Sequence, residues 1–261
     1  MEVGRRNAEP RANAPIRYLA EPAHVREVSL RGSADLAFWS ARLEPENLRP
    51  AEQGGRAQIL LVAAEMKFMG VRFAEVSFSV LVDVPGPEST EGAFLVHAFN
   101  GCRFFAYCER RFFATPYTYA NCHVAVGPRA LVQVTSRGQA VFRAERGPRP
   151  ERVEGPDAAA APPSICRQVD TWEGPVFLPT RGGAAEGEAR FFFARMRGPA
   201  TVSPFLGDVD LFILSAAAES SWRLLHDSDF KALEWLVRPD ATHGKSKTYR
   251  RGDFFPSLTA R

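Results

Sequence analysis

The chain has little cysteine: Cys102, Cys108, Cys122 and Cys166 are its four cysteines among 261 residues. So few cysteines exclude a disulfide-based scaffold, and we expect a reduced, cytoplasmic protein. Apolar runs of about 18 residues, the length that a membrane-spanning helix needs, are absent, so no membrane association is expected. Residues 1–15 carry charges and lack the apolar core of a secretory signal, which predicts a loose N-terminal tail.

Lysine is equally scarce, and the charge balance is close to neutral. Lys and Arg together number 33 against 30 acidic residues, a net charge of +3, yet the lysines are only Lys67, Lys231, Lys245 and Lys247. No stripe of basic residues is interleaved with aromatic ones, which argues against a nucleic-acid partner. The short basic cluster at 245–251 is expected to be solvated surface.

Phenylalanine, by contrast, is abundant, with 20 residues. Runs that are typical of β-strands lie at 58–64, which is continuously apolar, and at 73–84 and 93–99, which each contain two phenylalanines. Within 73–84 side chains alternate, so that Val76 and its even-numbered neighbours face one way and Glu75 and its odd-numbered neighbours face the other. Closely spaced runs of this kind indicate an antiparallel meander.

The rest of the chain adds short strands and a few helices. Phe105, Cys108 and Phe112 recur at helical spacing, and Asn100 and Pro116 would cap and end that helix. Further strands are predicted at 119–126, 130–135, 139–145, 190–197 and 208–215, and a second helix at 219–237. The pattern therefore predicts an α+β, predominantly β protein built on an antiparallel sheet.

Domain organisation follows from one interruption. Residues 146–163 are rich in Pro, Gly, Ala and charge and have no periodic apolar face, so we expect an exposed loop. We interpret residues 16–261 as a single domain that contains this loop.

Two stretches carry a resemblance to a known family. The first is Gly70-Val71-Arg72-Phe73-Ala74-Glu75-Val76, and the second, further along the chain, is Glu109-Arg110-Arg111-Phe112-Phe113-Ala114-Thr115-Pro116-Tyr117-Thr118-Tyr119-Ala120. In order and spacing they resemble the acetoacetate decarboxylase-like superfamily, which shows Gly-x-x-Tyr-x-Glu and then Gly-Arg-Glu-x-x-Gly-(Phe/Tyr)-Pro-Lys-Lys-x-Ala. A related group of uncharacterised bacterial proteins carries Leu-Pro-Tyr at the second site, which is closer to Thr115-Pro116-Tyr117.

The resemblance implies a curled antiparallel sheet, a cone or barrel, around a pocket for a small organic acid or ketone. In acetoacetate decarboxylases the first lysine of the pair forms a Schiff base with the substrate. Here Tyr117 and Thr118 occupy the two lysine positions, and neither can form an imine. Lys67 precedes the first motif. It could reach the pocket from a neighbouring strand, but an exposed position at a strand end is the favoured expectation.

Glu75 and Tyr117 are the candidate catalytic residues. If the face of Glu75 lines a cavity, partial desolvation would raise its pKa and suit it to general acid or base work. The alternative is a solvent-facing residue on a half-exposed strand. Tyr117 would donate a hydrogen bond to an enolate or carbonyl oxygen, or simply pack in the core.

Four further residues are candidates for substrate binding. Arg110 would hold a ligand carboxylate or form a structural ion pair. Tyr119 alternates with Tyr117 and would face the same way, while Phe73 and His97 lie in neighbouring strand-like runs.

A metal site is not expected. Cys102, Cys108, Cys122 and His123 include no Cys-x-x-Cys pair, and cysteine is often only a small buried hydrophobe. Cys108 as a nucleophile with His123 as its base lacks an orienting signature. No phosphate-binding glycine loop is present, so no cofactor is expected.

Two functional hypotheses follow, in addition to the less favoured case of a structural oligomer whose pocket is filled with Phe. The first is a lyase- or isomerase-like enzyme that acts on a keto acid or polyketide-like carbonyl compound without an imine, through decarboxylation, dehydration, cyclisation or isomerisation. The alternative is a non-catalytic protein that binds a small apolar organic acid in the same cavity. By analogy with the family, assembly into a homo-oligomer is expected.

Overall fold

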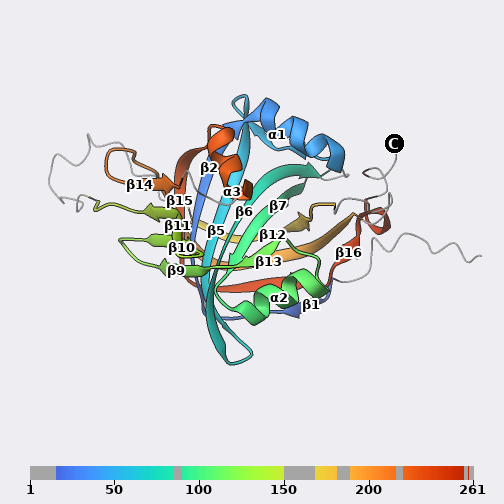
Figure 1. The fold of residues 1–261 in the computed structure, drawn as a ribbon, viewed down its shortest axis with the longest axis horizontal. Coiled ribbons are helices and arrows are strands. Elements are labelled where there is room, and N and C mark those ends of the chain that lie inside the picture. Colours follow the sequence, from blue (N-terminus) through green and yellow to red (C-terminus); the bar gives the residue numbers. More distant parts are fainter. Residues whose placement is uncertain are drawn as a thin grey trace, which may run out of the picture.

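The computed structural model describes residues 16–84, 90–149, 168–180, 189–215, 220–255 and 258. Strands dominate these residues, as the sequence predicted, and they form one large curled sheet and one small sheet (Figure 1). The predicted tail and most of the predicted Pro/Ala-rich loop lie outside the described residues. Among those that are described, no helix is long and apolar enough to span a bilayer.

The predicted meander forms the centre of the large sheet. Strands β5 (Arg56–Phe68), β6 (Val71–Val84) and β7 (Thr90–Asn100) follow one another and pair antiparallel. The turn between β5 and β6 places Met69 and Gly70 at φ of 49° and 83°. Because glycine adopts a positive φ readily, Gly70 of the first motif suits this tight hairpin.

Four long strands continue the sheet on both sides of the meander. β2 (Val25–Asp35) and β15 (Lys231–Ser246) extend it beyond β5, while β12 (Gln168–Phe177) and β13 (Arg190–Pro204) extend it beyond β7. The sheet curls so far that β13 also pairs with β15. Most pairs are antiparallel, although β12 pairs parallel with β7.

Short strands complete the edges of this sheet. β1 (Tyr18–Ala20) pairs with the end of β15, and β8 (Tyr117–Tyr119) pairs parallel with β7. The remaining short strands are β3 (Arg49–Pro50), β4 (Glu52–Gln53) and β16 (Tyr249–Arg250). Among the described residues, 3-10 turns lie at Glu44–Glu46 and Arg251–Asp253.

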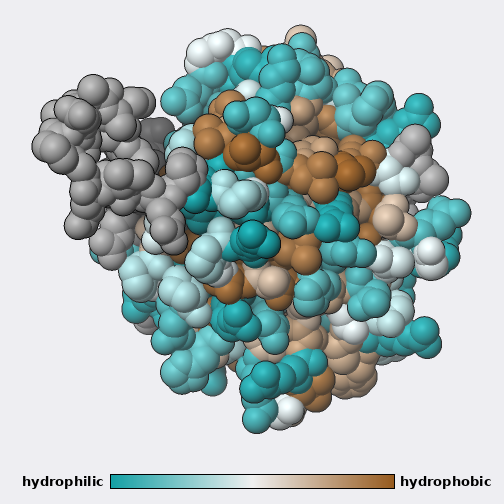
Figure 2. All heavy atoms as spheres, turned by 90° about the vertical axis from the view of Figure 1, so that its left-hand side faces the viewer, coloured by the Kyte–Doolittle hydropathy of each residue, from teal (hydrophilic) through white to brown (hydrophobic). Residues whose placement is uncertain are grey.

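The small sheet has the order β14-β11-β10-β9. Its strands are β9 (Asn121–Ala125), β10 (Leu131–Ser136), β11 (Gln139–Glu145) and β14 (Leu211–Leu214). The predicted strand at 119–126 is thus divided between β8, in the large sheet, and β9. Figure 2 shows the molecule from the side of the small sheet, where hydrophilic side chains divide the apolar surface into separate patches.

In the part of the chain that the structure describes, the helices that accompany the sheets are α1 (Leu36–Leu43), α2 (Arg103–Phe112) and α3 (Ser220–Asp227). Helix α2 confirms the helical spacing of its aromatic residues, although it begins after Cys102 rather than at Asn100. Asn100 ends β7, and its side chain still accepts a hydrogen bond from the Cys102 amide at 2.8 Å.

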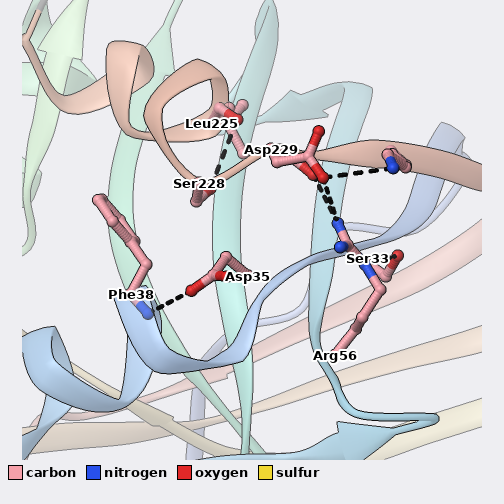
Figure 3. A network of polar contacts seen from close by, with 8 residues as sticks. Ser33, Asp35, Phe38, Arg56, Leu225, Ser228 and Asp229 are labelled. Carbon is pink, nitrogen blue, oxygen red and sulfur yellow. Dashed lines mark hydrogen bonds and ion pairs between the residues drawn. The ribbon is translucent and has the colours of Figure 1, made fainter.

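The predicted helix at 219–237 is wrong beyond Asp227. Asp229 adopts a positive φ of 50°, which ends the helix, and the chain then continues as β15. Arg56 stabilises this turn by donating hydrogen bonds to the backbone carbonyl of Asp229 at 2.6 Å and to the Asp229 carboxylate at 3.2 Å (Figure 3). Trp235 pairs with Leu30 on one side and Ser203 on the other, so pairing with two neighbours overrides the helical spacing.

The two faces of the large sheet pack against different partners. Val76, Phe78 and Val80 on β6 are completely buried in the main core, which extends to Val132 and Phe142 of the small sheet. The opposite face of β6 carries Glu75, Ser77 and Ser79, which line a cavity inside the curled sheet. The predicted alternation along this strand is therefore confirmed.

Asp210 ties the small sheet to the large one. Its buried carboxylate accepts hydrogen bonds from the Gly147 amide at 2.9 Å, from Arg149 at 2.7 Å and from Trp235 at 2.9 Å. Burial alone would raise the pKa of Asp210, but these bonds and the Leu206 amide lower it. We therefore expect the carboxylate to stay ionised in the folded protein.

We expect Asp210→Asn to lower the free energy of unfolding by about 2 kcal/mol, because one charge-assisted acceptor is lost in a buried site. Urea denaturation measures this change. Asp208→Asn, at an exposed position nearby, should stay within about 0.5 kcal/mol of the parent. Equal values for the two variants would contradict a structural role for Asp210.

Candidate active site

The inside of the curled sheet contains a cavity of about 540 Å³. Strands β5, β6, β7, β12, β13 and β15 supply its walls, and helix α2 covers one side through Phe105, Cys108 and Phe112. The helical spacing seen in the sequence thus puts these three side chains against one ligand-sized space. Ligand pockets in proteins commonly have volumes in this range.

Glu75 points into the cavity from the middle of β6. Asn100 Nδ2 lies 3.4 Å from its Oε2. Burial in the sheet raises the pKa of Glu75, the nearby Glu109 carboxylate raises it further, and Lys245, His243 and the Tyr117 hydroxyl oppose the shift. A carboxyl with a raised pKa can act as a general acid or base near neutral pH.

Tyr117 is buried beside Glu75, with 8% of its surface exposed. Its hydroxyl donates a hydrogen bond to the Glu75 carboxyl. Burial and the charges of Glu75 and Glu109 raise the pKa of Tyr117 well above its ordinary value, so the phenol keeps its proton. A protonated phenol can donate its single hydrogen bond to a developing oxyanion when that bond shifts from Glu75 to the ligand.

Lys245 reaches the same cavity from β15, far away in the sequence. Its Nζ forms an ion pair with Glu109 of α2, and Glu109 also accepts a hydrogen bond from Thr115 at 2.7 Å. The ammonium lies 4.8 Å from the ring centre of Phe113 and 4.7 Å from that of Phe192. The prediction that residue 245 belongs to a solvated surface is therefore wrong, because β15 curls its side chain inward.

His243 is a second cavity residue that the sequence did not reveal. Its Nε2 lies 2.8 Å from a carboxylate oxygen of Glu27, whose side chain is fully buried. The other carboxylate oxygen of Glu27 accepts hydrogen bonds from Arg238 and Ser29, each at 2.6 Å. The dyad joins β15 to β2, and no local signal in the sequence pairs these two strands.

Of the residues predicted to bind substrate, Phe73 lies at the cavity, whereas Arg110 and Tyr119 are exposed. Phe73 lines the cavity and packs against Phe105, with ring centres 4.8 Å apart. Arg110 is exposed on α2 and is not among the described residues that line the cavity, whereas Lys245 is. Tyr119 is 44% exposed, and the guanidinium carbon of Arg103 lies over its ring, 4.7 Å from the ring centre.

His97 lies on the opposite face of β7 and does not line the cavity. Trp222 donates to its Nδ1 at 2.9 Å, and Thr118 lies 3.3 Å from its Nε2. A regular alternation after Leu95 would have turned His97 inward. The register shift opposite Phe78 inserts an extra residue into β7 and reverses the alternation.

The structure also shows the surroundings of Lys67 and Cys122. Lys67 is exposed near the end of β5, as predicted. Burial raises the pKa of Cys122 to about 12, with a contribution from Glu75, so this thiol stays protonated. Over the part of the chain that is described, no cluster of three or more His, Cys, Asp or Glu is arranged to hold a metal.

These features define a class of protein: a curled β-sheet that encloses a small-molecule cavity with titratable groups on its wall. No family model and no curated protein matches the chain. Solved structures do match, and they identify the architecture.

Acetoacetate decarboxylase from Legionella pneumophila subsp. pneumophila str. Philadelphia 1 is 16% identical over 95% of this chain and 98% of that chain, with a TM-score of 0.57. An acetoacetate decarboxylase-like enzyme from Sphingomonas wittichii RW1 is 13% identical over 95% and 98%, with a TM-score of 0.56. The enduracididine biosynthesis enzyme MppR is 12% identical over 90% and 89%, with a TM-score of 0.56. The chain has the acetoacetate decarboxylase-like fold, as its two motifs implied.

Proposed function

We propose that this protein is an enzyme that moves protons on a small keto acid by acid–base chemistry and without an imine. The observation that carries the proposal is the Glu75–Tyr117 pair on the cavity wall. A carboxyl with a raised pKa beside a protonated phenol supplies a proton-transfer group and an oxyanion donor at one point.

The chemistry can be written for two related reactions. In enolisation, ionised Glu75 removes the proton next to the ketone, and the electron pair of that C–H bond moves to the carbonyl oxygen, which Tyr117 stabilises. In decarboxylation of a 3-oxo acid, the electron pair of the breaking C–C bond takes the same course as carbon dioxide leaves. In enolisation Glu75 then returns the proton that it removed to the enolate carbon. In decarboxylation Glu75 is protonated at the start, gives that proton to the enolate carbon, and regains one from water.

Lys245 has a binding role in this proposal. Its ammonium lies in a largely apolar cavity and would attract a substrate carboxylate. While it is bound to Glu109 as an ammonium, it has no lone pair with which to attack a carbonyl. The anchor that the sequence assigned to Arg110 is thus assigned to Lys245.

The test uses 2-oxobutanoate and acetoacetate as probes in deuterated buffer. We expect the protein to exchange the protons next to the ketone, or to release carbon dioxide, at least about a hundredfold faster than buffer alone. Proton NMR follows the exchange. Binding of both acids with no exchange and no carbon dioxide would overturn the proposal in favour of the binding-protein alternative.

A second experiment, treatment with borohydride, distinguishes an imine mechanism from acid–base catalysis without an imine. Borohydride reduces an imine to a stable secondary amine, which mass spectrometry detects. We expect no added mass after treatment with either probe, in the parent or in Lys245→Met. A ketone-sized addition on Lys245 would show that this residue acts as a nucleophile and that the non-imine mechanism is wrong.

A further inference from the structure

The cavity is larger and more apolar than a small keto acid requires. Acetoacetate and 2-oxobutanoate each have seven heavy atoms. If each atom takes roughly the 30 Å³ that a water molecule takes in the liquid, such an acid fills about 200 Å³. The cavity has a volume of about 540 Å³. Its carboxylate and lysine side chains are Glu75, Glu109 and Lys245, and most of the remaining lining is aromatic or aliphatic.

An aromatic wall continues from Glu75 toward the β5–β6 turn. Phe73 lies two residues from Glu75 on the same strand face, about 7 Å further along β6. Its ring packs against Phe105 of α2 at 4.8 Å, and Phe105 also contacts Phe68 at 6.1 Å. These three side chains, here called the phenylalanine wall, lie between the polar groups and the turn.

Apolar side chains also surround the outer end of the wall. Met69 at the turn is 79% exposed, and Phe104 and Phe112 of α2 are 65% and 64% exposed, while all three line the cavity. A contiguous apolar surface that is left in water commonly marks a binding site. Here it continues into a cavity that already contains a charged anchor.

We propose that the natural substrate is a keto acid with an apolar tail of several carbons. Its carboxylate would lie at Lys245 and its carbonyl at Glu75 and Tyr117, and its tail would extend along the phenylalanine wall. The distance along β6 from Glu75 to the turn is about 16 Å, which accommodates such a tail in an extended form. This inference rests on the proposed function for the placement of the carbonyl.

The test measures dissociation constants for unbranched 2-oxo acids from pyruvate to 2-oxodecanoate by calorimetry. Each methylene that leaves water on binding should tighten binding about fourfold, until the cavity is filled. Dissociation constants that stay level along the series would overturn the proposal.

A matched pair of variants locates the tail. Phe105→Ser should weaken binding of 2-oxooctanoate by about tenfold or more and leave pyruvate unchanged, because only the longer acid reaches the wall. Phe38→Ser, on α1 and outside the cavity lining, is the control. Far-ultraviolet circular dichroism verifies that both variants fold. Equal losses for the short and the long acid would place the tail elsewhere and contradict the assignment.

The outcomes distinguish this inference from the proposed function. If long acids bind tightly and exchange no protons, the tail site stands and the catalytic proposal fails. If short acids exchange protons but chain length has no effect, the catalysis stands and the tail site fails.

Discussion

Glu75→Gln is expected to slow proton exchange on a bound keto acid by about a hundredfold to ten-thousandfold. Glutamine can accept the hydrogen bond from Tyr117 but cannot take up or deliver a proton. Binding of the same acid should change little, because Lys245 holds the carboxylate. Proton NMR in deuterated buffer gives the rate, and calorimetry gives the affinity.

Glu65→Gln is the matched control, since Glu65 lies on the neighbouring strand β5 and pairs with Arg26 at 3.4 Å. It should exchange protons at the parental rate. A Glu75→Gln protein that is as active as this control would remove Glu75 from the mechanism.

Glu75→Gln should not lower the stability of the fold. The raised pKa of Glu75 means that the folded state holds the proton more tightly than the unfolded state does. Its stabilising contribution is complete below the unfolded pKa and is lost as the pH rises through the folded pKa. At neutral pH we therefore expect Glu75→Gln to melt no lower than the parent, which is typical of residues kept for activity rather than stability.

Glu27→Ala is expected to lower the free energy of unfolding by about 4 kcal/mol. Arg238 is 2% exposed and would be left buried without its carboxylate partner, and His243 would lose the hydrogen bond that orients it. Urea denaturation measures the loss. Glu65→Ala breaks a partly exposed pair with Arg26 and should cost less than about 1 kcal/mol.

The effect of Glu27→Ala should depend on pH. Burial alone would raise the pKa of Glu27, but hydrogen bonds and charge from His243, Arg238 and Ser29 lower it. Its stabilising contribution is therefore complete above the unfolded pKa of about 4.3 and is lost as the pH falls through the lowered folded pKa. The stability difference between parent and variant should shrink in acid, and a difference that stays constant would contradict this assignment.

Some of the site could be predicted because it depends on local rules. The period of two along 73–84 put Glu75 and Val76 on opposite faces, and the structure keeps that division. Gly70 indicated a turn, and helical spacing grouped Phe105 with Phe112. Each of these signals lies within one element, where side-chain direction follows from backbone geometry.

Other parts of the site depend on contacts that no local pattern encodes. The extra residue in β7 turned His97 toward Trp222, although alternation favoured the cavity. The spacing of apolar residues favoured a helix where β15 forms. A strand forms instead because β15 pairs with a neighbour on each side and gains backbone hydrogen bonds that local propensity does not include. In both cases pairing with neighbouring strands outweighed the local preference.

The sequence by itself predicted the predominantly β class and the central meander, and it offered Glu75, Tyr117 and Phe73 as candidates, all of which line the cavity. Only the tertiary structure decided that Lys245 and His243 meet them. The reason is the closure of the sheet: pairing of β15 with both β2 and β13 brings residues more than a hundred positions apart onto one inner wall. Strand order of this kind is set by long-range pairing, which the pattern of a single strand does not specify.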